Sequence, residues 1–239
     1  MQRGTSRVVV ASCDELAGRP VGGEVRVWVV PLDSPPVSEA DLLACLSAEE
    51  RDRADRYKVR KPRHQFVTGR GLLRRILGNC LALPPHEVPI GYTGAGKPIL
   101  DCGTLHFNVT HTDQIALIAL AGRPVGVDVE QVRSLANPDG LVQRFFSAAE
   151  CASYRMLPPE LRPHGFFRAW TCKEALIKAV GLSVTNLGEF DVELHPHRPA
   201  ALLETRHPAL MGMSWELEVW EPVAGFAAAI ALAGSPETG

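Results

Sequence analysis

Short stretches in which apolar and polar residues alternate predict strands along the whole chain. EVRVWVV at 24–30 and VGVDVE at 125–130 alternate in this way and are rich in valine. LHFNV at 105–109 and IALIAL at 115–120 follow each other closely and predict a hairpin. Further strands are predicted over 190–194, 215–220 and 226–232. The predicted strands therefore fall into separate groups, with longer helical segments between them.

Segments built from good helix formers predict helices over 38–46, 47–57, 63–78 and 147–156. Another helix, FFRAWTCKEALIKAVG at 166–181, ends at a glycine, which suits a helix C-cap. At about 100° per residue, three charged and three large apolar side chains of this segment share an arc of roughly 140°. They are Phe167, Trp170, Lys173, Glu174, Ile177 and Lys178. Because unpaired charge is costly to bury, we expect these charges to meet a metal ion, a phosphate or another part of the chain.

A weak internal repeat runs through the chain. VRVWVV at 25–30 recurs as VGVDVE at 125–130, and SAEE at 47–50 recurs as SAAE at 147–150. The helical segment at 66–78 aligns with that at 169–181, which places Gly71 opposite Glu174. LIALAGRP at 117–124 resembles AIALAGSP at 229–236.

Because the four matches keep the same order, the sequence predicts an α+β fold that is a pseudo-dimer of two similar halves. The expected domains are residues 1–122 and 123–239, each a small antiparallel sheet packed with a long helix. A site built between two such halves would be shared by both, and Gly71 means that the carboxylate of Glu174 is not duplicated.

The strand at 125–130 places two carboxylates on one face. Its valines should face the core, and Gly126, Asp128 and Glu130 should face the other way. Two carboxylates so close repel each other unless a cation or water screens them, and oxygen ligands of this kind suit Mg²⁺. An acidic, solvated strand edge is the alternative, and Glu174 on its largely apolar arc favours the metal site.

Other polar residues leave two interpretations open. Lys178 follows Glu174 by one helical turn. The two either form a simple surface pair, or Lys178 binds a phosphate, and the same alternatives hold for Lys173. Thr110 and His111 end a predicted strand, where a histidine is often structural but both could bond a phosphate. The basic run at 51–63 is either a solvated surface or a site for a polyanion.

The sequence disfavours several classes of protein function. GYTGAGKP at 91–98 lacks the hydroxyl of a nucleotide-binding loop, although Lys97 could still meet a phosphate. No cysteine or histidine pair has zinc spacing. The net charge of -2 gives no support for nucleic-acid binding, and no apolar run is long enough to cross a membrane. The six scattered cysteines predict reduced thiols and a cytoplasmic location.

Four motifs occur in the order GKP (96–98), FNVTHT (107–112), GVDVE (126–130) and WTCKEALIK (170–178). Together with FSAAE at 146–150, this set resembles the 4′-phosphopantetheinyl transferases of the Sfp type, from about residue 46 to 188. The resemblance implies transfer of the 4′-phosphopantetheine arm of coenzyme A to a serine of an acyl or peptidyl carrier protein. It also implies release of 3′,5′-adenosine bisphosphate, a need for Mg²⁺ with Mn²⁺ as an alternative, and a monomer. The active site is then expected in the cleft between the halves, once per chain, with the metal site carried by the second half.

The resemblance also assigns roles. Asp128, Glu130 and Glu174 would hold the metal, and Glu174 and Lys178 would be catalytic, with Glu174 as the base. Coenzyme A would be bound by Arg53, Lys97, Thr110, His111, Asp128 and Lys178. Gly126 would let the ligand approach the strand, and Glu150 would orient the site. The alternatives are a non-catalytic module that binds coenzyme A or a carrier protein, and a Mg²⁺-dependent pyrophosphate hydrolase.

Overall fold

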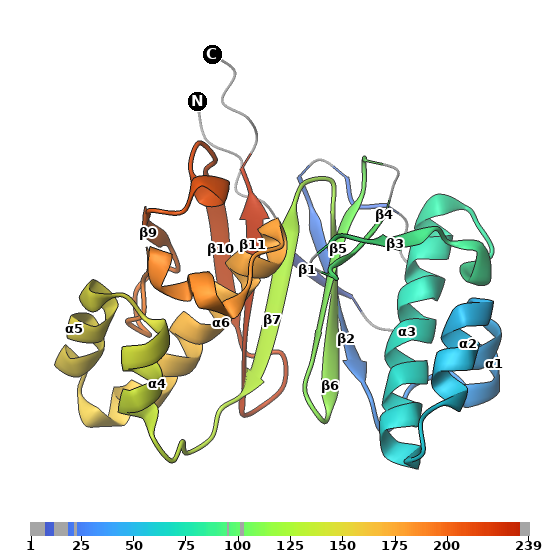
Figure 1. The fold of residues 1–239 in the computed structure, drawn as a ribbon, viewed down its shortest axis with the longest axis horizontal. Helices are drawn as coiled ribbons and strands as arrows, with labels where there is room; N and C mark the ends of the chain where they lie inside the picture. The colour runs from blue at the N-terminus through green and yellow to red at the C-terminus, as the bar shows by residue number, and fades with distance from the viewer. Residues whose placement is uncertain (1–7, 12–18, 22, 95, 101–102, 235–239) are drawn as a thin grey trace.

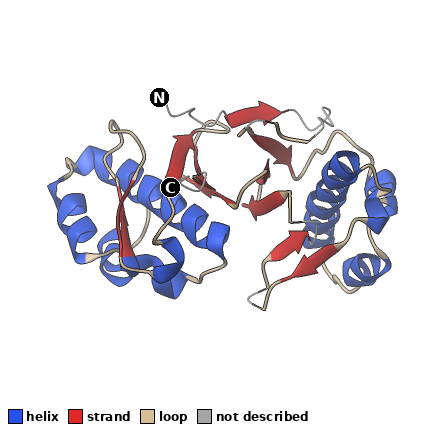
Figure 2. Ribbon diagram, turned by 90° about the horizontal axis from the view of Figure 1, so that it is seen from above, coloured by secondary structure: helices blue, strands red, loops and turns tan. Residues whose placement is uncertain are grey.

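The computed structural model describes residues 8–11, 19–21, 23–94, 96–100 and 103–234. Two α+β halves lie side by side, with their sheets in the middle and their long helices on the outside (Figure 1). Seen from above, the strands of the two large sheets stand between two groups of helices (Figure 2). The predicted α+β pseudo-dimer is therefore confirmed.

Apart from β1, which only the first half has, both halves contain helices and strands in the same order. The first contains β1 (Val8–Ala11), β2 (Val25–Pro31), α1 (Glu39–Ala44), α2 (Ala48–Asp55), α3 (Arg60–Leu81), a 3₁₀ turn at Pro85–Glu87, β3 (Ile90–Tyr92), β4 (Pro98–Leu100), β5 (His106–His111) and β6 (Ile115–Ala121). The second contains β7 (Val125–Gln131), α4 (Pro138–Phe145), α5 (Ala148–Met156), α6 (Arg162–Val180), β8 (Phe190–Val192), β9 (Leu202–Thr205), β10 (Trp215–Trp220) and β11 (Phe226–Ala233), with 3₁₀ turns at Pro159–Leu161, Val184–Glu189 and Pro208–Leu210.

The sheets repeat this relation. The first half has the strand order β1-β2-β6-β5, and the second has β10-β11-β7, so β2-β6-β5 corresponds to β7-β11-β10. Each half adds a small two-stranded sheet, β3-β4 or β8-β9. The prediction of antiparallel sheets holds except for β1, which pairs with β2 in parallel. The sequence did not indicate β1, because its three consecutive valines show no alternation.

Three helices differ from prediction. α3 spans Arg60–Leu81, three residues more at each end than the predicted 63–78. α6 begins at Arg162, four residues before the predicted start, with Pro163 in its first turn. Proline suits this position because backbone N–H groups of the first turn have no partner within the helix, and proline has no N–H. The short helix α4 was not predicted. Its start is marked by the Asn137 side chain, which accepts a hydrogen bond from the Gly140 amide, and by Pro138 in the first turn.

Three apolar layers result. One lies between α3 and the first sheet, one between α6 and the second sheet, and one between the two sheets. The valines at 125, 127 and 129 belong to the middle layer, as the alternation predicted. Within the described ranges, no helix has the length and apolar character needed to cross a bilayer.

The opposite face of β7 lies against α6 at very short range. A Cβ atom added at Gly126 would lie 1.9 Å from the Ala175 carbonyl oxygen and 2.5 Å from the Ala179 amide nitrogen. The expectation that Gly126 admits a ligand is therefore wrong, since the helix backbone occupies that space. Gly71 is constrained similarly, because a Cβ there would lie 2.9 Å from the Leu42 carbonyl oxygen of α1.

The close contact predicts a large cost for a single methyl group at Gly126. Gly126→Ala should lower the free energy of unfolding by about 3 kcal/mol or more, because neither backbone can move aside without disturbing a sheet or a helix. Gly122→Ala is the control, since nothing lies within 4 Å of a Cβ there. Urea denaturation measures both, and wild-type stability in Gly126→Ala would contradict the packing described.

Candidate functional site

The charges of α6 find different partners. Lys173 is fully buried and lies 2.8 Å from Glu150 Oε2, so its partner is another part of the chain and the phosphate interpretation is wrong for it. Lys178 donates to Asp128 Oδ1 at 2.5 Å and to the Thr110 hydroxyl at 3.2 Å. Among the described residues, Glu174 makes no hydrogen bond or ion pair.

Asp128 lies at the centre of this group. Thr110 of β5 also donates to its Oδ1, at 3.0 Å, so the first half, β7 and α6 meet at one carboxylate oxygen. The other oxygen, Oδ2, is buried and has no hydrogen-bond partner. A buried carboxylate oxygen without a donor is costly unless a cation or a ligand completes it.

Glu174 and Glu130 are half-buried beside Asp128. Burial raises the pKa of Glu174 to about 7, with the charge of Lys178 acting against this and those of Asp128 and Glu130 adding to it. Burial and the Asp128 charge also raise the pKa of Glu130, while the charges of Lys178 and Arg133 and a hydrogen bond from Trp170 lower it. The charges of the carboxylates thus influence one another, and Lys178 acts on both Glu130 and Glu174.

This donor set has the chemistry that a hard divalent cation prefers, and the unpartnered Asp128 oxygen is the observation that favours one. Within the described part of the chain, however, no three carboxylate, histidine or cysteine side chains already converge on a metal position. In this arrangement the Lys178 ammonium contacts Asp128 directly. The assignment of Asp128, Glu130 and Glu174 as metal ligands stays a prediction.

Lys97 extends from the first half to the second. Its ammonium donates to the Ala179 carbonyl at 2.7 Å, near the C-terminal end of α6. Burial lowers the pKa of Lys97 to about 8, and no carboxylate within the described residues pairs with it. An anionic ligand would favour its charged form.

Asn108, in the same motif as Thr110, also joins the halves. Its side-chain oxygen accepts a hydrogen bond from the Val127 amide at 2.9 Å.

A cavity of about 300 Å³ lies on the α3 side of β5. Arg53 and His111 line it, whereas Thr110 points to Asp128, because neighbouring residues of a strand face opposite ways. The predicted ligands of coenzyme A therefore form two groups, separated by β5.

Three other residues of this cavity were not predicted from the sequence: Arg70, Tyr57 and Phe66. Arg70 has a buried Nη1 without a hydrogen-bond partner, and the two aromatic rings lie 5.6 Å apart. The Arg53 guanidinium lies 4.8 Å from the centre of the Phe66 ring. In the repeat Arg70 aligns with Lys173, and this alignment gave no indication of a pocket.

Comparison with known proteins gives a consistent answer. Residues 124–231 match the sequence model of the 4′-phosphopantetheinyl transferase superfamily, and residues 35–123 match that of the N-terminal part of 4′-phosphopantetheinyl transferases. The 4′-phosphopantetheinyl transferase HetI of Nostoc is 40% identical over 217 residues, which cover 88% of each chain.

Two Bacillus subtilis relatives are more distant. One 4′-phosphopantetheinyl transferase is 27% identical over 71% of this chain and 77% of its own. The transferase Sfp is 24% identical over 72% and 77% respectively. The chain belongs to the 4′-phosphopantetheinyl transferases, and the expected family and type of enzyme are confirmed.

The bridging hydroxyl of Thr110 provides a test. Thr110→Val should lower the phosphopantetheinyl transfer rate by roughly fivefold, because Asp128 loses a donor whose contribution is about 1 kcal/mol. Thr110→Ser keeps the hydroxyl and should remain close to wild type. Steady-state rates of the purified variants measure this, and equal activity of the valine and serine variants would contradict it.

Proposed function

We propose that the protein transfers the 4′-phosphopantetheine arm of coenzyme A to a serine of an acyl or peptidyl carrier protein. A new bond forms between the serine oxygen and the β-phosphorus, the pyrophosphate bond breaks, and 3′,5′-adenosine bisphosphate leaves. The observation that carries this proposal is the meeting of Thr110, Asp128 and Lys178 at the junction of the halves, with Glu174 unpartnered beside them.

The cavity on the α3 side of β5 is the proposed site of the nucleotide end of coenzyme A. Arg53, Arg70 and His111 bring positive or protonatable groups to its wall, and Tyr57 and Phe66 bring aromatic surface. Phosphate groups pair with guanidinium groups, and an adenine can stack on aromatic rings. The unpartnered Arg70 Nη1 supports an anionic ligand.

The pyrophosphate is proposed to lie towards Lys97, Thr110 and Lys178. Lys97 and Lys178 come from different halves, and each contacts oxygen atoms that a phosphate oxygen could replace. Two ammonium groups and a hydroxyl would bind the leaving phosphate and stabilise the charge that grows on it.

Mg²⁺ is the proposed metal, held by Asp128, Glu130 and Glu174, and Mn²⁺ is the alternative. When bound, it would neutralise phosphate oxygens and favour in-line displacement. Displacement of Lys178 from Asp128 towards the phosphates would free the aspartate for this role.

Glu174 is the proposed general base, which accepts the serine proton directly or through a water. Its half-buried carboxylate has no competing hydrogen bond among the described residues, and a base with a pKa near the working pH is effective.

The proposed setting is a cytoplasmic monomer whose halves divide at 122 and 123. The four cysteines that the structure describes are free thiols, which suits a reducing compartment, and Cys13 and Cys102 lie outside the described residues. The repeated order of elements supports the division.

Intact mass of a carrier protein incubated with coenzyme A, Mg²⁺ and the enzyme tests the function directly. We expect a gain equal to one phosphopantetheine arm, loss of this gain with a chelator, and its return with excess Mg²⁺. Glu174→Gln should still bind coenzyme A but turn over at least about 100-fold more slowly, the usual effect of a positioned base.

Three outcomes would contradict parts of the proposal. Binding of coenzyme A with no mass gain on a panel of carriers would favour a non-catalytic module. Breakdown of coenzyme A without a carrier would favour a pyrophosphate hydrolase. Wild-type turnover in Glu174→Gln would remove this residue from the mechanism.

The nucleotide pocket can be tested separately from catalysis. Arg70→Met should weaken binding of 3′,5′-adenosine bisphosphate by about tenfold to a hundredfold, since a charge-assisted hydrogen bond contributes about 1.5–3 kcal/mol. Arg75→Met, on the same helix but outside the cavity, is the matched control. Isothermal calorimetry measures both, and equal affinities would place the nucleotide elsewhere.

A further inference from the structure

The buried pair of Glu150 and Lys173 has no part in the proposed chemistry. Lys173 is 0% exposed and Glu150 is 3% exposed, and both lie on helices that border the core of the second half. Burial lowers the pKa of Lys173 and raises that of Glu150, while their direct contact acts against both shifts. Such a pair is weak support for stability alone, which raises the question of what it does.

The pair joins four elements. The Lys173 ammonium donates to the Leu187 and Phe190 carbonyls at 2.5 Å each, besides contacting Glu150 at 2.8 Å. Glu150 accepts from the Ser147 amide at the start of α5 and from the Val192 amide of β8, at 2.9 Å each. The two side chains thus tie α5, α6, the 3₁₀ turn after α6, and β8 together.

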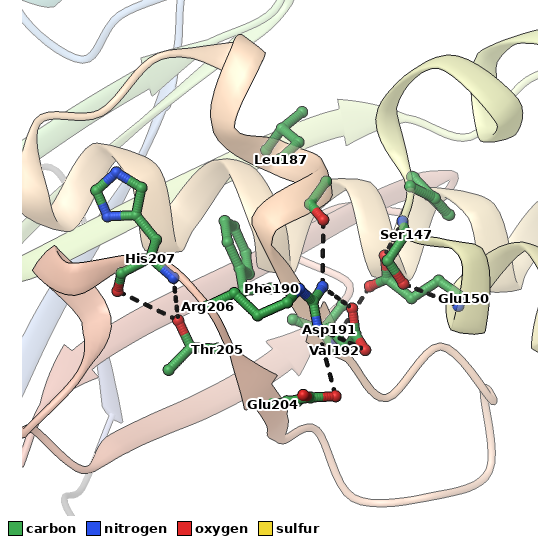
Figure 3. Close-up of polar contacts among 12 residues, drawn as sticks. Ser147, Glu150, Leu187, Phe190, Asp191, Val192, Glu204, Thr205, Arg206 and His207 are labelled. Carbon is green, nitrogen blue, oxygen red and sulfur yellow. Dashed lines mark hydrogen bonds and ion pairs between the residues drawn. The ribbon is translucent and has the colours of Figure 1, made fainter.

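A second ion pair flanks this junction. Figure 3 shows Asp191 and Arg206 beside Glu150, with Arg206 also reaching Glu204. The Arg206 Nη2 lies 2.7 Å from Asp191 Oδ1, which fixes β8 against the strand that follows. The surroundings of Lys173 are therefore held in place from both sides.

The position of Lys173 on α6 gives the pair its consequence. The next residue is Glu174, about 100° further around the helix. The Ala175 and Ala179 backbone on the other side presses on Gly126 of β7. Because Glu174 has no partner of its own among the described residues, its direction depends on how the helix is held between these two contacts.

The first half contains a corresponding buried ion pair, but no carboxylate that this pair could position. Glu50 caps α2 through Ser47, pairs with Arg74 and lies 3.5 Å from Arg70 of α3. Arg74 donates to the Pro85 and Val88 carbonyls, as Lys173 does to the corresponding turn. At the position of Glu174, however, α3 has Gly71. Arg70 is the residue that aligns with Lys173, but Arg74 makes the equivalent contacts with a carboxylate and a turn, so Arg74 serves as the control.

We propose that Glu150 and Lys173 are positioning residues that set the direction of the Glu174 carboxylate against Asp128. The inference rests on the proposed role of Glu174 as the base. The loss of transfer rate on changing the pair should then depend on whether Glu174 is present. A purely structural pair would instead lower stability and activity equally in both backgrounds.

The test is a double-mutant cycle on transfer to a carrier protein. Because a misplacement of roughly 1 Å can cost about 100-fold in rate, Lys173→Met should lower kcat at least about tenfold and leave the KM for coenzyme A within about threefold. In a Glu174→Gln background, the same Lys173→Met change should alter the residual rate by less than about threefold, since residues that act as a unit are non-additive. An equal fold-loss in both backgrounds would overturn the proposal.

Stability is controlled in parallel. Glu150→Gln combined with Lys173→Met removes both charges, so its melting temperature should recover relative to Lys173→Met while kcat stays low. Recovery of kcat along with the melting temperature would overturn the proposal. If Lys173→Met does not fold, Glu150→Gln takes its place in both backgrounds and decides by the same criterion.

Arg74→Met breaks the corresponding ion pair of the first half, between Glu50 and Arg74. It should lower the melting temperature without the selective loss of kcat that Lys173→Met shows. A matching loss of kcat in Arg74→Met would also overturn the positioning role. A wild-type enzyme that transfers nothing would instead refute the proposed function, so the two failures are distinct.

Discussion

The contact between α6 and β7 is the constraint on which the site depends. With glycine at 126, the helix backbone lies directly on the strand, and the side chains that flank this contact are forced into the same small region. Asp128 follows on the same strand face, and Lys178 lies between the helix residues that border the contact. Any larger residue at 126 would lift the helix and separate these groups. The arrangement of the acidic side chains therefore depends on Gly126, which has no side chain that could react or bind.

The charged groups of the second half also differ in whether they have a partner. Lys173 and Glu150 satisfy one another in the core, while one buried oxygen of Asp128 is left without a donor. This imbalance costs folding free energy, which a cation and a charged substrate can recover on binding. The same principle applies to the cavity on the α3 side of β5, where one Arg70 nitrogen is left unsatisfied.

Most of the fold could be predicted from alternation and the repeat, because both reflect the geometry of strands and helices directly. β1 escaped prediction because a run of valines without alternation has no preferred face, and α4 because its eight residues depend on a cap rather than on a periodic pattern. The mixed charges of α6 indicated that partners were needed, but not which ones. That Lys173 turns inward and Lys178 towards Asp128 follows from tertiary contacts. The same applies to Arg70, Tyr57 and Phe66, which come together only when α2 and α3 pack against β5.

Strand β5 separates the two parts of the site by a single residue. Thr110 faces the carboxylates and His111 faces the cavity, so the pleat alone decides which of the two regions each side chain enters. A slip of β5 by one position against β6 would exchange the two, and would also move the Asn108 side chain away from β7. The hairpin between these strands should therefore tolerate exchanges of side chains far better than insertions or deletions.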